Sequence, residues 1–324
     1  MPLSEFQLIA NYFTRQPMRR ADVALGIGDD AALLRVPAGQ CLAVSIDTLV
    51  EGVHFLPDIA PADLGYRALA VNLSDLAAMG AQPAWATLAI TVPRVDESWL
   101  AQFSTGFFEL AQQQRVQLVG GNTTRGPLSI SVQVHGFVPE EQALKRSGAQ
   151  PGDLIFVTGT LGDAAIGLQA ALRKISVAPE HEQFAAQRWL RPSPRVAEGL
   201  ALRGVASACI DISDGLLADL GHVCAASQVG ARISVEKTPV STLFNSAGQG
   251  DWALALCAGD DYELCFTAAP GRRSHVEELF RAFACGVTCI GVIESAPGVR
   301  CEMYDGRAFI PAQRGYDHFD APAS

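Results

Sequence analysis

Residues Asp211–His222 have the sequence DISDGLLADLGH, in which a strand end, an acidic turn and a helix follow one another. Carboxylates that converge repel one another at neutral pH unless cations lie between them. Hard oxygen ligands without a nearby His or Cys cluster suit Mg²⁺, which usually arrives with phosphates. The sequence therefore predicts an enzyme that handles Mg²⁺ and a polyphosphate. Four other segments also place aspartate beside a small residue near an apolar run: GIGDDAALL (Gly26–Leu34), SIDTLVEGVHF (Ser45–Phe55), NLSDLAAMGA (Asn72–Ala81) and AGDDYELCF (Ala258–Phe266).

Length and composition favour two globular domains. The chain has 324 residues, of which 49% are hydrophobic, enough for full cores. Its formal charge is −10, and it contains no stripe rich in Lys or Arg. We therefore expect no nucleic-acid partner, and an acidic protein that handles phosphates must obtain its cations from bound metal.

The cysteines and the hydropathy predict a cytoplasmic protein. There are eight cysteines and no CxxC pair, and most lie in apolar stretches, as buried thiols do in a reducing compartment. The first residues lack a basic segment followed by an apolar one, and no run of about 18 apolar residues occurs. We expect no membrane partner.

Helical and strand-like segments alternate in both halves of the chain. The polar stretch Ser147–Gly152, rich in Gly and Pro, separates two apolar regions and predicts domains of residues 1–150 and 151–324. The order of elements mixes αβ and ββ steps, which favours an α/β (α+β) fold with mixed sheets. Residues 174–195 are expected to be a polar connector, because two prolines near its end oppose a regular helix there.

Two common nucleotide-binding architectures are disfavoured by their missing motifs. The chain has no GxxxxGK[ST] loop and no GxGxxG that opens a helix. The nearest approach, GTLGDAAIG from Gly159, follows a predicted strand but lacks the lysine. We therefore expect neither a P-loop kinase nor a dinucleotide-binding dehydrogenase.

The individual acidic positions differ in how strongly they point to a ligand. Asp29 and Asp30 in a loop are compatible with an ordinary Asx turn as well as with metal binding. Asp47 has the same ambiguity, although Ser45 and Thr48 add hydroxyl groups beside it. Asp75 lies within an apolar helical pattern, where an unpaired carboxylate is costly, and this favours a ligand role.

Other polar positions also allow two interpretations. GGNTTRG (Gly120–Gly126) is expected to form a loop that approaches a phosphate, or else a simple turn. Ser213 or Asp214 is expected to cap the following helix, whose N-terminus would attract phosphate. Arg146 in a second polar loop could neutralise a polyphosphate or be an ordinary surface cation, and His54 could face the site or the core.

Taken together and in this order, these segments resemble the thiamine-monophosphate kinase family, within the superfamily of aminoimidazole ribonucleotide synthetase. The likeness also rests on VTGTLGDAAIG, RPSPR and GYDHF, and it extends over nearly the whole chain. It implies a two-domain synthetase-like fold, in which residues 1–150 bind ATP and Mg²⁺ and form a homodimer through their sheet, and residues 151–324 form an α+β domain. It also implies transfer of the ATP γ-phosphate to thiamine monophosphate, with several Mg²⁺ ions and no covalent nucleophile.

The resemblance assigns roles residue by residue. The metal ligands or their close neighbours would be Asp30, Ser45, Asp47, Asp75, Asn122, Asp211 and Asp214. The contacts with ATP would be Gly121, Asn122, Arg146 and Ser213, and the contacts with thiamine monophosphate would be His54, Asp260, Asp261 and Tyr316.

Asn122 departs from the family pattern, which has aspartate there in GGDTTRG. An amide still offers a carbonyl oxygen to Mg²⁺ but brings no charge. Two alternatives therefore stay open: a sister ATP-dependent synthetase of the same superfamily, and a non-catalytic or impaired nucleotide-binding form.

Overall fold

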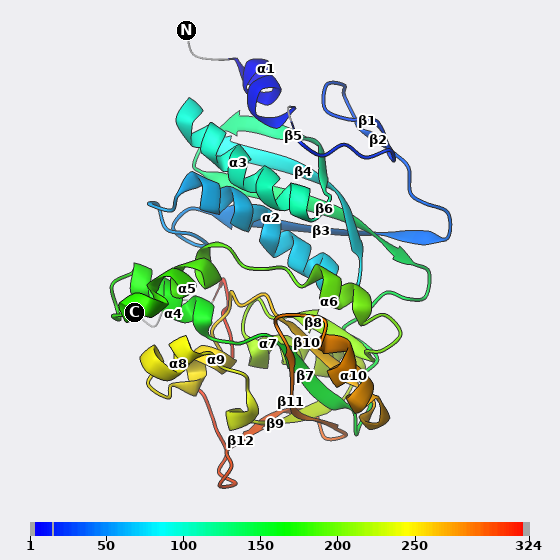
Figure 1. Cartoon of the computed structure of the whole chain (residues 1–324), viewed down its shortest axis with the longest axis vertical. Coiled ribbons are helices and arrows are strands. Elements are labelled where there is room, and N and C mark those ends of the chain that lie inside the picture. Colours follow the sequence, from blue (N-terminus) through cyan, green and yellow to red (C-terminus); the bar gives the residue numbers. More distant parts are fainter. Residues whose placement is uncertain (1–3, 15, 320–324) are drawn as a thin grey trace. The chain divides into compact units, whose positions relative to one another are not determined.

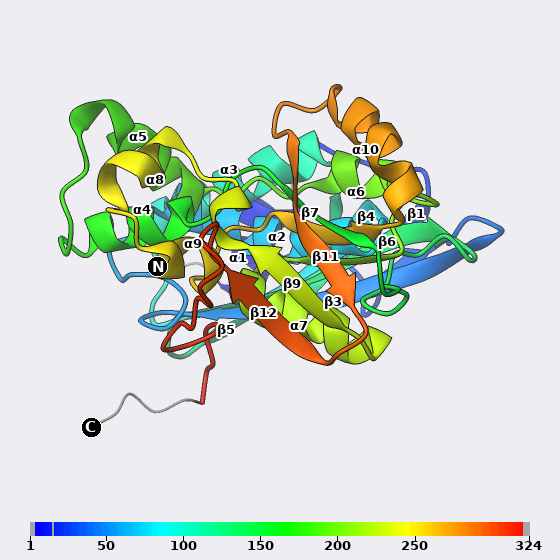
Figure 2. The same ribbon diagram turned by 90° about the horizontal axis from the view of Figure 1, so that it is seen from below.

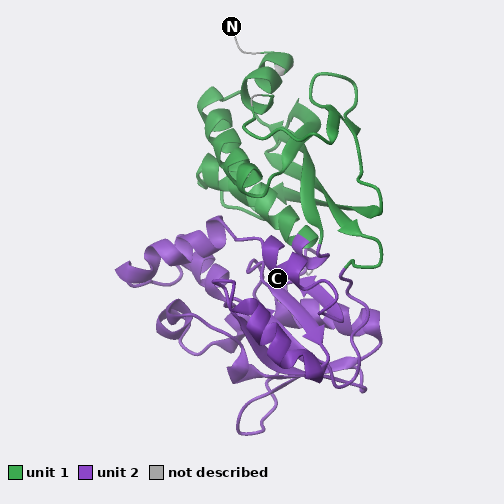
Figure 3. Cartoon of the chain, turned by 45° about the vertical axis from the view of Figure 1, so that its right-hand side comes forward, with its two compact units in different colours: residues 1–76, 81–143 green, residues 77–80, 144–324 purple. Residues whose placement is uncertain are grey.

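The chain folds into two compact units, each with its own sheet. The structure is a computed structural model that describes residues 4–14 and 16–319. Unit 1 comprises residues 1–76 and 81–143, and unit 2 comprises residues 77–80 and 144–324 (Figure 3). The sheets have four and six strands, and a small β1–β2 pair accompanies the first.

Unit 1 is a four-stranded mixed sheet with the order β3-β6-β4-β5. Only the β4–β5 pair is parallel among the described strands of this sheet. Buried and partly exposed residues alternate along β6, as expected for a strand whose two faces meet different surroundings. The elements are α1 (Glu5–Leu8), the π-helix Ile9–Phe13, β1 (Val23–Leu25), β2 (Leu33–Leu34), β3 (Gln40–Val50), α2 (Pro61–Ala78), β4 (Gln82–Val92), α3 (Glu97–Gln113), β5 (Gln117–Arg125) and β6 (Ser129–Pro139).

The helices α2 and α3 lie side by side against one face of this sheet (Figure 1). Two glycines permit the contact. A Cβ atom on Gly65 of α2 would overlap the carbonyl oxygen of Phe103, and one on Gly106 of α3 would overlap that of Ala62. The two backbones therefore touch where neither has a side chain. Asp96 caps α3, because its carboxylate accepts the N–H of Trp99 at 3.0 Å.

Unit 2 is a six-stranded sheet with the order β12-β9-β11-β7-β10-β8, antiparallel except for the β12–β9 pair. Figure 2 shows β12, β9 and β11 side by side, and α7 contacts β8, β9 and β12. The elements are β7 (Leu154–Thr158), α4 (Asp163–Ala171), α5 (Pro179–Leu190), α6 (Val196–Ala201), β8 (Ala208–Asp211), α7 (Leu216–Ser227), β9 (Gly230–Ser234), the 3₁₀-helix Val235–Lys237, α8 (Thr242–Ala247), α9 (Trp252–Leu256), β10 (Leu264–Ala268), the 3₁₀-helix Pro270–Arg272, α10 (Arg273–Phe280), β11 (Val287–Glu294) and β12 (Gly298–Glu302).

The structure corrects three local predictions. The segment GGNTTR is strand rather than loop, because β5 pairs with β4 up to Arg125 and Gly121 allows the backbone of Leu88 to come close. Asp47 lies inside β3, so it does not form the Asx turn that the sequence also allowed. Residues 174–195 contain the helix α5, which begins at Pro179 and ends before the prolines that were expected to exclude it.

The described residues include no helix long and apolar enough to cross a membrane.

The α2–α3 contact predicts that two glycine substitutions change the free energy of unfolding in opposite directions. We expect Gly106→Ala to lower the free energy of unfolding by about 1–3 kcal/mol, because the added methyl group overlaps a backbone carbonyl that cannot rotate away. A matched control is Gly221→Ala within α7, where a Cβ atom would meet nothing within 4 Å. This change should raise the free energy by about 0.4–1 kcal/mol. Urea unfolding of both variants measures the difference, and equal effects would contradict the close contact.

Candidate active site

In unit 1, strand β3 and helix α2 bring three of the predicted residues together. The hydroxyl of Ser45 donates a short hydrogen bond to the carboxylate of Asp75. Two residues further along β3, the backbone N–H of Asp47 donates to the side-chain oxygen of Asn72 at 2.9 Å. Asn72 is buried and its amide also donates to the carbonyl of Ala68, which fixes its orientation. The alternation of strand residues thus places Ser45 and Asp47 on the face that α2 covers.

Asp30 lies in an exposed loop before β2. Its backbone N–H donates to the carboxylate of Asp29 at 2.8 Å, so the first aspartate of the pair folds back onto the loop. Gly28 has a φ of +124°, a conformation that L side chains rarely adopt. The loop therefore presents Asp30 to solvent while Asp29 shapes the turn.

His54 is oriented by the end of β3. Its Nδ1 accepts the backbone N–H of Val50 at 3.0 Å, which requires that nitrogen to be unprotonated. The ring is partly exposed and presents Nε2 as its second polar atom. This geometry suits a neutral imidazole that donates one hydrogen bond.

Asn122 is separated from Asp47 within unit 1. The strand register aligns Asp47 with Val132, Val132 with Leu88, and Leu88 with Gly121. Asp47 and Gly121 are therefore three strand spacings apart, about 14 Å. Because successive side chains of a strand point to opposite faces, Asn122, which follows Gly121, lies on the face of the sheet opposite to that of Asp47. One ion could not be bound by both side chains of the same chain.

The oxygen donors occur in pairs rather than in closed cages. Among residues 4–14 and 16–319, no group of three or more His, Cys, Asp and Glu side chains is arranged to hold a metal ion. Mg²⁺ usually keeps several water molecules and is bound by one or two carboxylates together with substrate phosphates. The pair of Ser45 and Asp75, with Asp47 nearby on β3, fits this kind of site.

In unit 2, two segments that are distant in sequence are joined backbone to backbone. The N–H groups of Asp260 and Tyr262 donate to the carbonyls of Ser213 and Ile212, both at 2.9 Å. The N–H of Ile212 donates to the carbonyl of Glu263 at 2.8 Å. The acidic turn before α7 and the segment before β10 are thus fixed to each other, whereas Asp211, the last residue of β8, is buried with only 4% of its surface exposed.

Tyr316 joins the same surface from the end of the chain. Its N–H donates to the carbonyl of Asp214 at 3.0 Å, and its half-exposed ring packs edge-on against His318. Burial raises the pKa of the Asp214 carboxyl, while the charges of His318 and His222 oppose this and those of Asp260 and Asp317 add to it. Arg146 lies in an exposed loop, and its carbonyl accepts the hydroxyl of Ser227 at 3.2 Å.

Sequence reasoning missed Asp219, which organises the acidic turn. One of its carboxylate oxygens accepts the backbone N–H groups of Ser213, Asp214 and Gly215 at 3.0, 3.1 and 3.2 Å. The expected side-chain cap by Ser213 or Asp214 is wrong, because the N-cap is Gly215 and the acceptor comes from inside the helix. Burial, with the nearby charge of Asp214, raises the pKa of the Asp219 carboxyl to about 7, although the three N–H groups act against this. A carboxylate within the apolar pattern LLADLGH was the available signal.

The adjacent residues Asp260 and Asp261 have different environments. Asp260 is partly exposed, has a φ of +72°, and accepts the hydroxyl of Tyr262 at 3.1 Å. Asp261 is 1% exposed, and its carboxylate accepts the N–H of Gly162 at 2.8 Å. Burial raises the pKa of the Asp261 carboxyl well above its usual value, and Arg188 opposes this shift from 3.9 Å. Asp260 is therefore the member of the pair that a solute can reach.

Behind this pair lies a buried ionic network that was not predicted. Arg195 of the RPSPR segment donates to both carboxylate oxygens of Glu263, which is fully buried and also accepts the hydroxyl of Thr158 at 2.7 Å. Arg188 of α5 lies 3.2 Å from Glu263 and donates to the carbonyl of Thr160. Such buried pairs are costly to break, because removing one partner leaves an unpaired charge. The network holds α5 and the start of β10 together.

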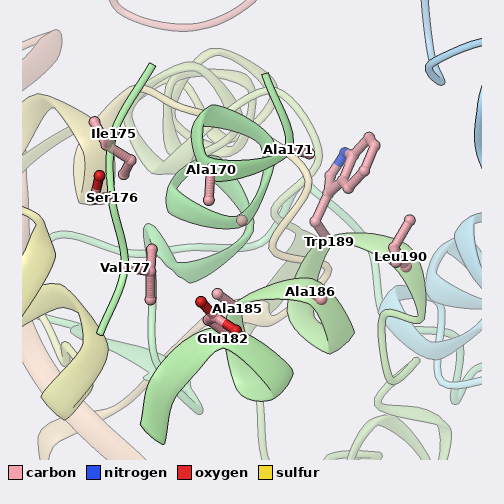
Figure 4. A pocket seen from close by; sticks show the side chains of 11 residues that line it. Ala170, Ala171, Ile175, Ser176, Val177, Glu182, Ala185, Ala186, Trp189 and Leu190 are labelled. Carbon is pink, nitrogen blue, oxygen red and sulfur yellow. The ribbon is translucent and has the colours of Figure 1, made fainter. Parts of the chain in front are cut away.

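A cavity of about 340 Å³ lies between α4 and α5 (Figure 4). Its walls are mainly small and apolar side chains, with Trp189 and Glu182 as the larger members. None of the predicted site residues contributes to this lining among the described residues.

Comparison with known proteins places the chain. The family "AIR synthase related protein, N-terminal domain" matches residues 28–138, and the corresponding C-terminal domain matches residues 150–303. A thiamine-monophosphate kinase of Escherichia coli (strain K12) is 51% identical over 325 residues, which cover 99% of this chain and 100% of that protein.

Two solved structures agree in fold. A thiamine-monophosphate kinase from Stenotrophomonas maltophilia K279a superposes with a TM-score of 0.84 at 47% identity, covering 90% of this chain and 93% of the other. AaThiL complexed with AMPPCP and TMP superposes with a TM-score of 0.76 at 33% identity, covering 90% and 92%. The predicted two-domain fold with mixed sheets and the predicted family are confirmed, and the chain belongs to the thiamine-monophosphate kinase family of AIR synthase related proteins.

Proposed function

We propose that the chain transfers the γ-phosphate of ATP to thiamine monophosphate and so forms thiamine diphosphate. The observation that carries this proposal is the identity of 51% with a thiamine-monophosphate kinase over the full length of both proteins. A related structure binds AMPPCP and TMP, and its fold is the same as that of this chain. The acidic loops of both units provide the oxygen ligands that such a reaction needs.

Several Mg²⁺ ions are part of this proposal. In unit 1, the metal ligands would be Ser45, Asp47 and Asp75. The Ser45 hydroxyl already orients the Asp75 carboxylate there. In unit 2, the metal ligands would be Asp211 and Asp214. The outlying candidates, Asp30 in its exposed loop and Asn122 on β5, would serve other ions or phosphate-bound water. When bound, the metal would neutralise phosphate charge and clamp the reacting groups.

The acceptor chemistry explains why the chain needs no nucleophile of its own. The attacking atom is a phosphate oxygen, and a phosphate group is already largely ionised near pH 7. No general base has to activate it. The main difficulty is to bring two anions together, so positioning and electrostatic stabilisation provide the catalysis. We assign no covalent catalytic residue.

The remaining candidates would position the two substrates. For ATP these are Gly121, Asn122, Arg146 and Ser213, and for thiamine monophosphate His54, Asp260, Asp261 and Tyr316. Asp260 and the half-exposed Tyr316 are accessible, and the Nε2 of His54 can donate to a phosphate oxygen. The buried Asp261 would act through the backbone of its neighbours rather than by contact.

The proposal includes a homodimer formed through the sheet of unit 1, in the cytoplasm. Strand β3 exposes Leu42, Val44 and Ile46, with 42%, 50% and 59% of their surfaces accessible. The three alternate with Ser45 and Asp47, so they share the face of the sheet opposite α2. An apolar row of this kind is typical of a protein–protein interface. Sedimentation equilibrium tests the dimer, and a mass of 34.3 kDa, that of one chain, would contradict it.

We expect the protein to form labelled thiamine diphosphate from γ-labelled ATP and thiamine monophosphate, and to remain unlabelled itself after denaturation. The reason is that the acceptor oxygen attacks directly and no side chain receives the phosphate. Stable label on the protein would contradict direct transfer. A sister synthetase would instead turn over formylglycinamidine ribonucleotide, and an impaired form would bind ATP without product.

We expect Asp75→Ala to lower turnover by about 10²–10³-fold, the range found when one preorganised charge-stabilising group is removed. The physical reason is the loss of the carboxylate that Ser45 orients. Asp63→Ala, in the first turn of the same helix, is the matched control for loss of charge. Steady-state rates at saturating Mg²⁺ test this prediction. Near-normal turnover of Asp75→Ala would show that the residue has only a structural role.

Asn122→Asp should lower the Mg²⁺ concentration needed for half-maximal turnover by about tenfold, because a charged oxygen ligand replaces a neutral one. The exposed position of Asn122 on β5 leaves room for the change without repacking. Rates measured over a series of Mg²⁺ concentrations test this. If both forms respond identically to metal, position 122 does not limit metal binding.

A further inference from the structure

We propose that Asp219 is a positioning residue that serves as an internal anion for the acidic turn before α7. It occupies the N–H groups that a phosphate would otherwise bind, and so reserves the turn for metal-bound phosphate. The proposal rests on the proposed function, because it assigns Asp219 a role in how that site receives ATP.

The first argument is the hydrogen bonding. The N-terminus of a helix and the amides before it form a ready anion site, since several N–H groups point outward and the helix dipole favours negative charge. Here the N–H groups of Ser213, Asp214 and Gly215 all point to one oxygen of Asp219, at 3.0–3.2 Å. The carboxylate is 3% exposed and comes from the first turns of the same twelve-residue helix. The anion site is therefore filled by the chain itself.

The second argument is that the turn has little freedom to rearrange. A Cβ atom on Gly215 would lie 2.7 Å from the carbonyl of Cys257, and one on Gly259 would overlap the carbonyl of Ser213. The N–H of Asp260 is bonded to the same Ser213 carbonyl at 2.9 Å. Because the backbone is held from outside the helix, its amides would remain in place if the Asp219 carboxylate were removed.

The third argument is electrostatic. Asp219 and Asp214 place two carboxyl groups at the start of α7, and the three N–H groups of the turn are already bonded to one of them. A bare polyphosphate that approached this turn would meet negative charge and no available amide. A polyphosphate that carries Mg²⁺ would instead find the Asp214 carboxylate as a ligand. Asp219 therefore favours the metal complex over the free anion.

The test measures metal-free anion binding and turnover on the full chain. We expect Asp219→Ala to bind inorganic tripolyphosphate in the presence of EDTA about tenfold more tightly than the parent chain, because three amides are released. Titration calorimetry gives this constant. The same variant should lose about tenfold or more of its Mg²⁺-dependent kcat/KM for ATP. Opposite signs in the two measurements are not expected from a residue that merely stabilises the fold.

Two further variants complete the design. Asp219→Asn keeps an oxygen acceptor for the three amides but removes the charge, so it should bind tripolyphosphate more tightly than the parent chain and less tightly than Asp219→Ala, and this smaller gain is the test if Asp219→Ala does not fold. Asp317→Ala removes another carboxylate that acts on Asp214, but one that is exposed and bonded to none of the three amides. It controls for a general loss of negative charge.

Two results would overturn the proposal: no gain of tripolyphosphate binding in folded Asp219 variants, or an equal gain in Asp317→Ala. Failure of the parent chain to form thiamine diphosphate would instead contradict the proposed function. The metal-free binding contrast would still be measurable in that case, so the two failures can be told apart.

Discussion

The repulsion between carboxylates is the constraint on which the site depends. Neutral donors contribute to meeting it at several of the predicted site residues and at Asp219. Asp75 accepts a serine hydroxyl, Asp29 and Asp219 accept backbone N–H groups, and Asp260 accepts a tyrosine hydroxyl. A neutral donor fixes the orientation of a carboxylate without cancelling its charge.

Three glycines beside predicted site residues, Gly121, Gly215 and Gly259, permit close contacts of the chain's own backbone. In the structure, the close neighbour of Gly121 is the carbonyl of Leu88, that of Gly215 is Cys257, and that of Gly259 is Ser213. Each glycine permits two segments to touch without a side chain between them. The motifs therefore combine acid and glycine because the carboxylates must stand on loops that are locked together.

Sequence reasoning succeeded where the signal was local. The apolar spacing of residues 61–79 predicts a helix, and α2 spans Pro61–Ala78. The β-type run of residues 128–138 predicts a strand, and β6 spans Ser129–Pro139. The helix α5 was missed because its composition is polar and its buried face is set by partners such as Glu263, which lies some 75 residues later in the chain. The strand pairing of GGNTTR was missed for a similar reason, since it depends on β4.

The same distinction separates the predicted site residues from Asp219, which the motifs did not indicate. Asp214 and Asp260 stand in recognisable motifs, whereas the role of Asp219 depends on where its helix turns back to the preceding amides. The buried acids Asp261 and Glu263 look like a continuation of the motif GDDYE, yet they face inward. A sequence shows which residues carry charge, but burial decides which of them a solute can meet.

The distribution of positive charge supports the proposed role of metal beside the substrates. Arg188 and Arg195, the guanidinium groups beside the acidic loops of unit 2, are bonded to buried acids and to the carbonyl of Thr160. Burial and the Glu263 carboxylate raise the cost of releasing them, because an unpaired charge would remain inside. They stabilise the loops from behind and leave the substrate side acidic. Under the proposed function, two phosphate-bearing substrates would approach such a surface together with cations, and the acidic loops would then bind what they otherwise repel.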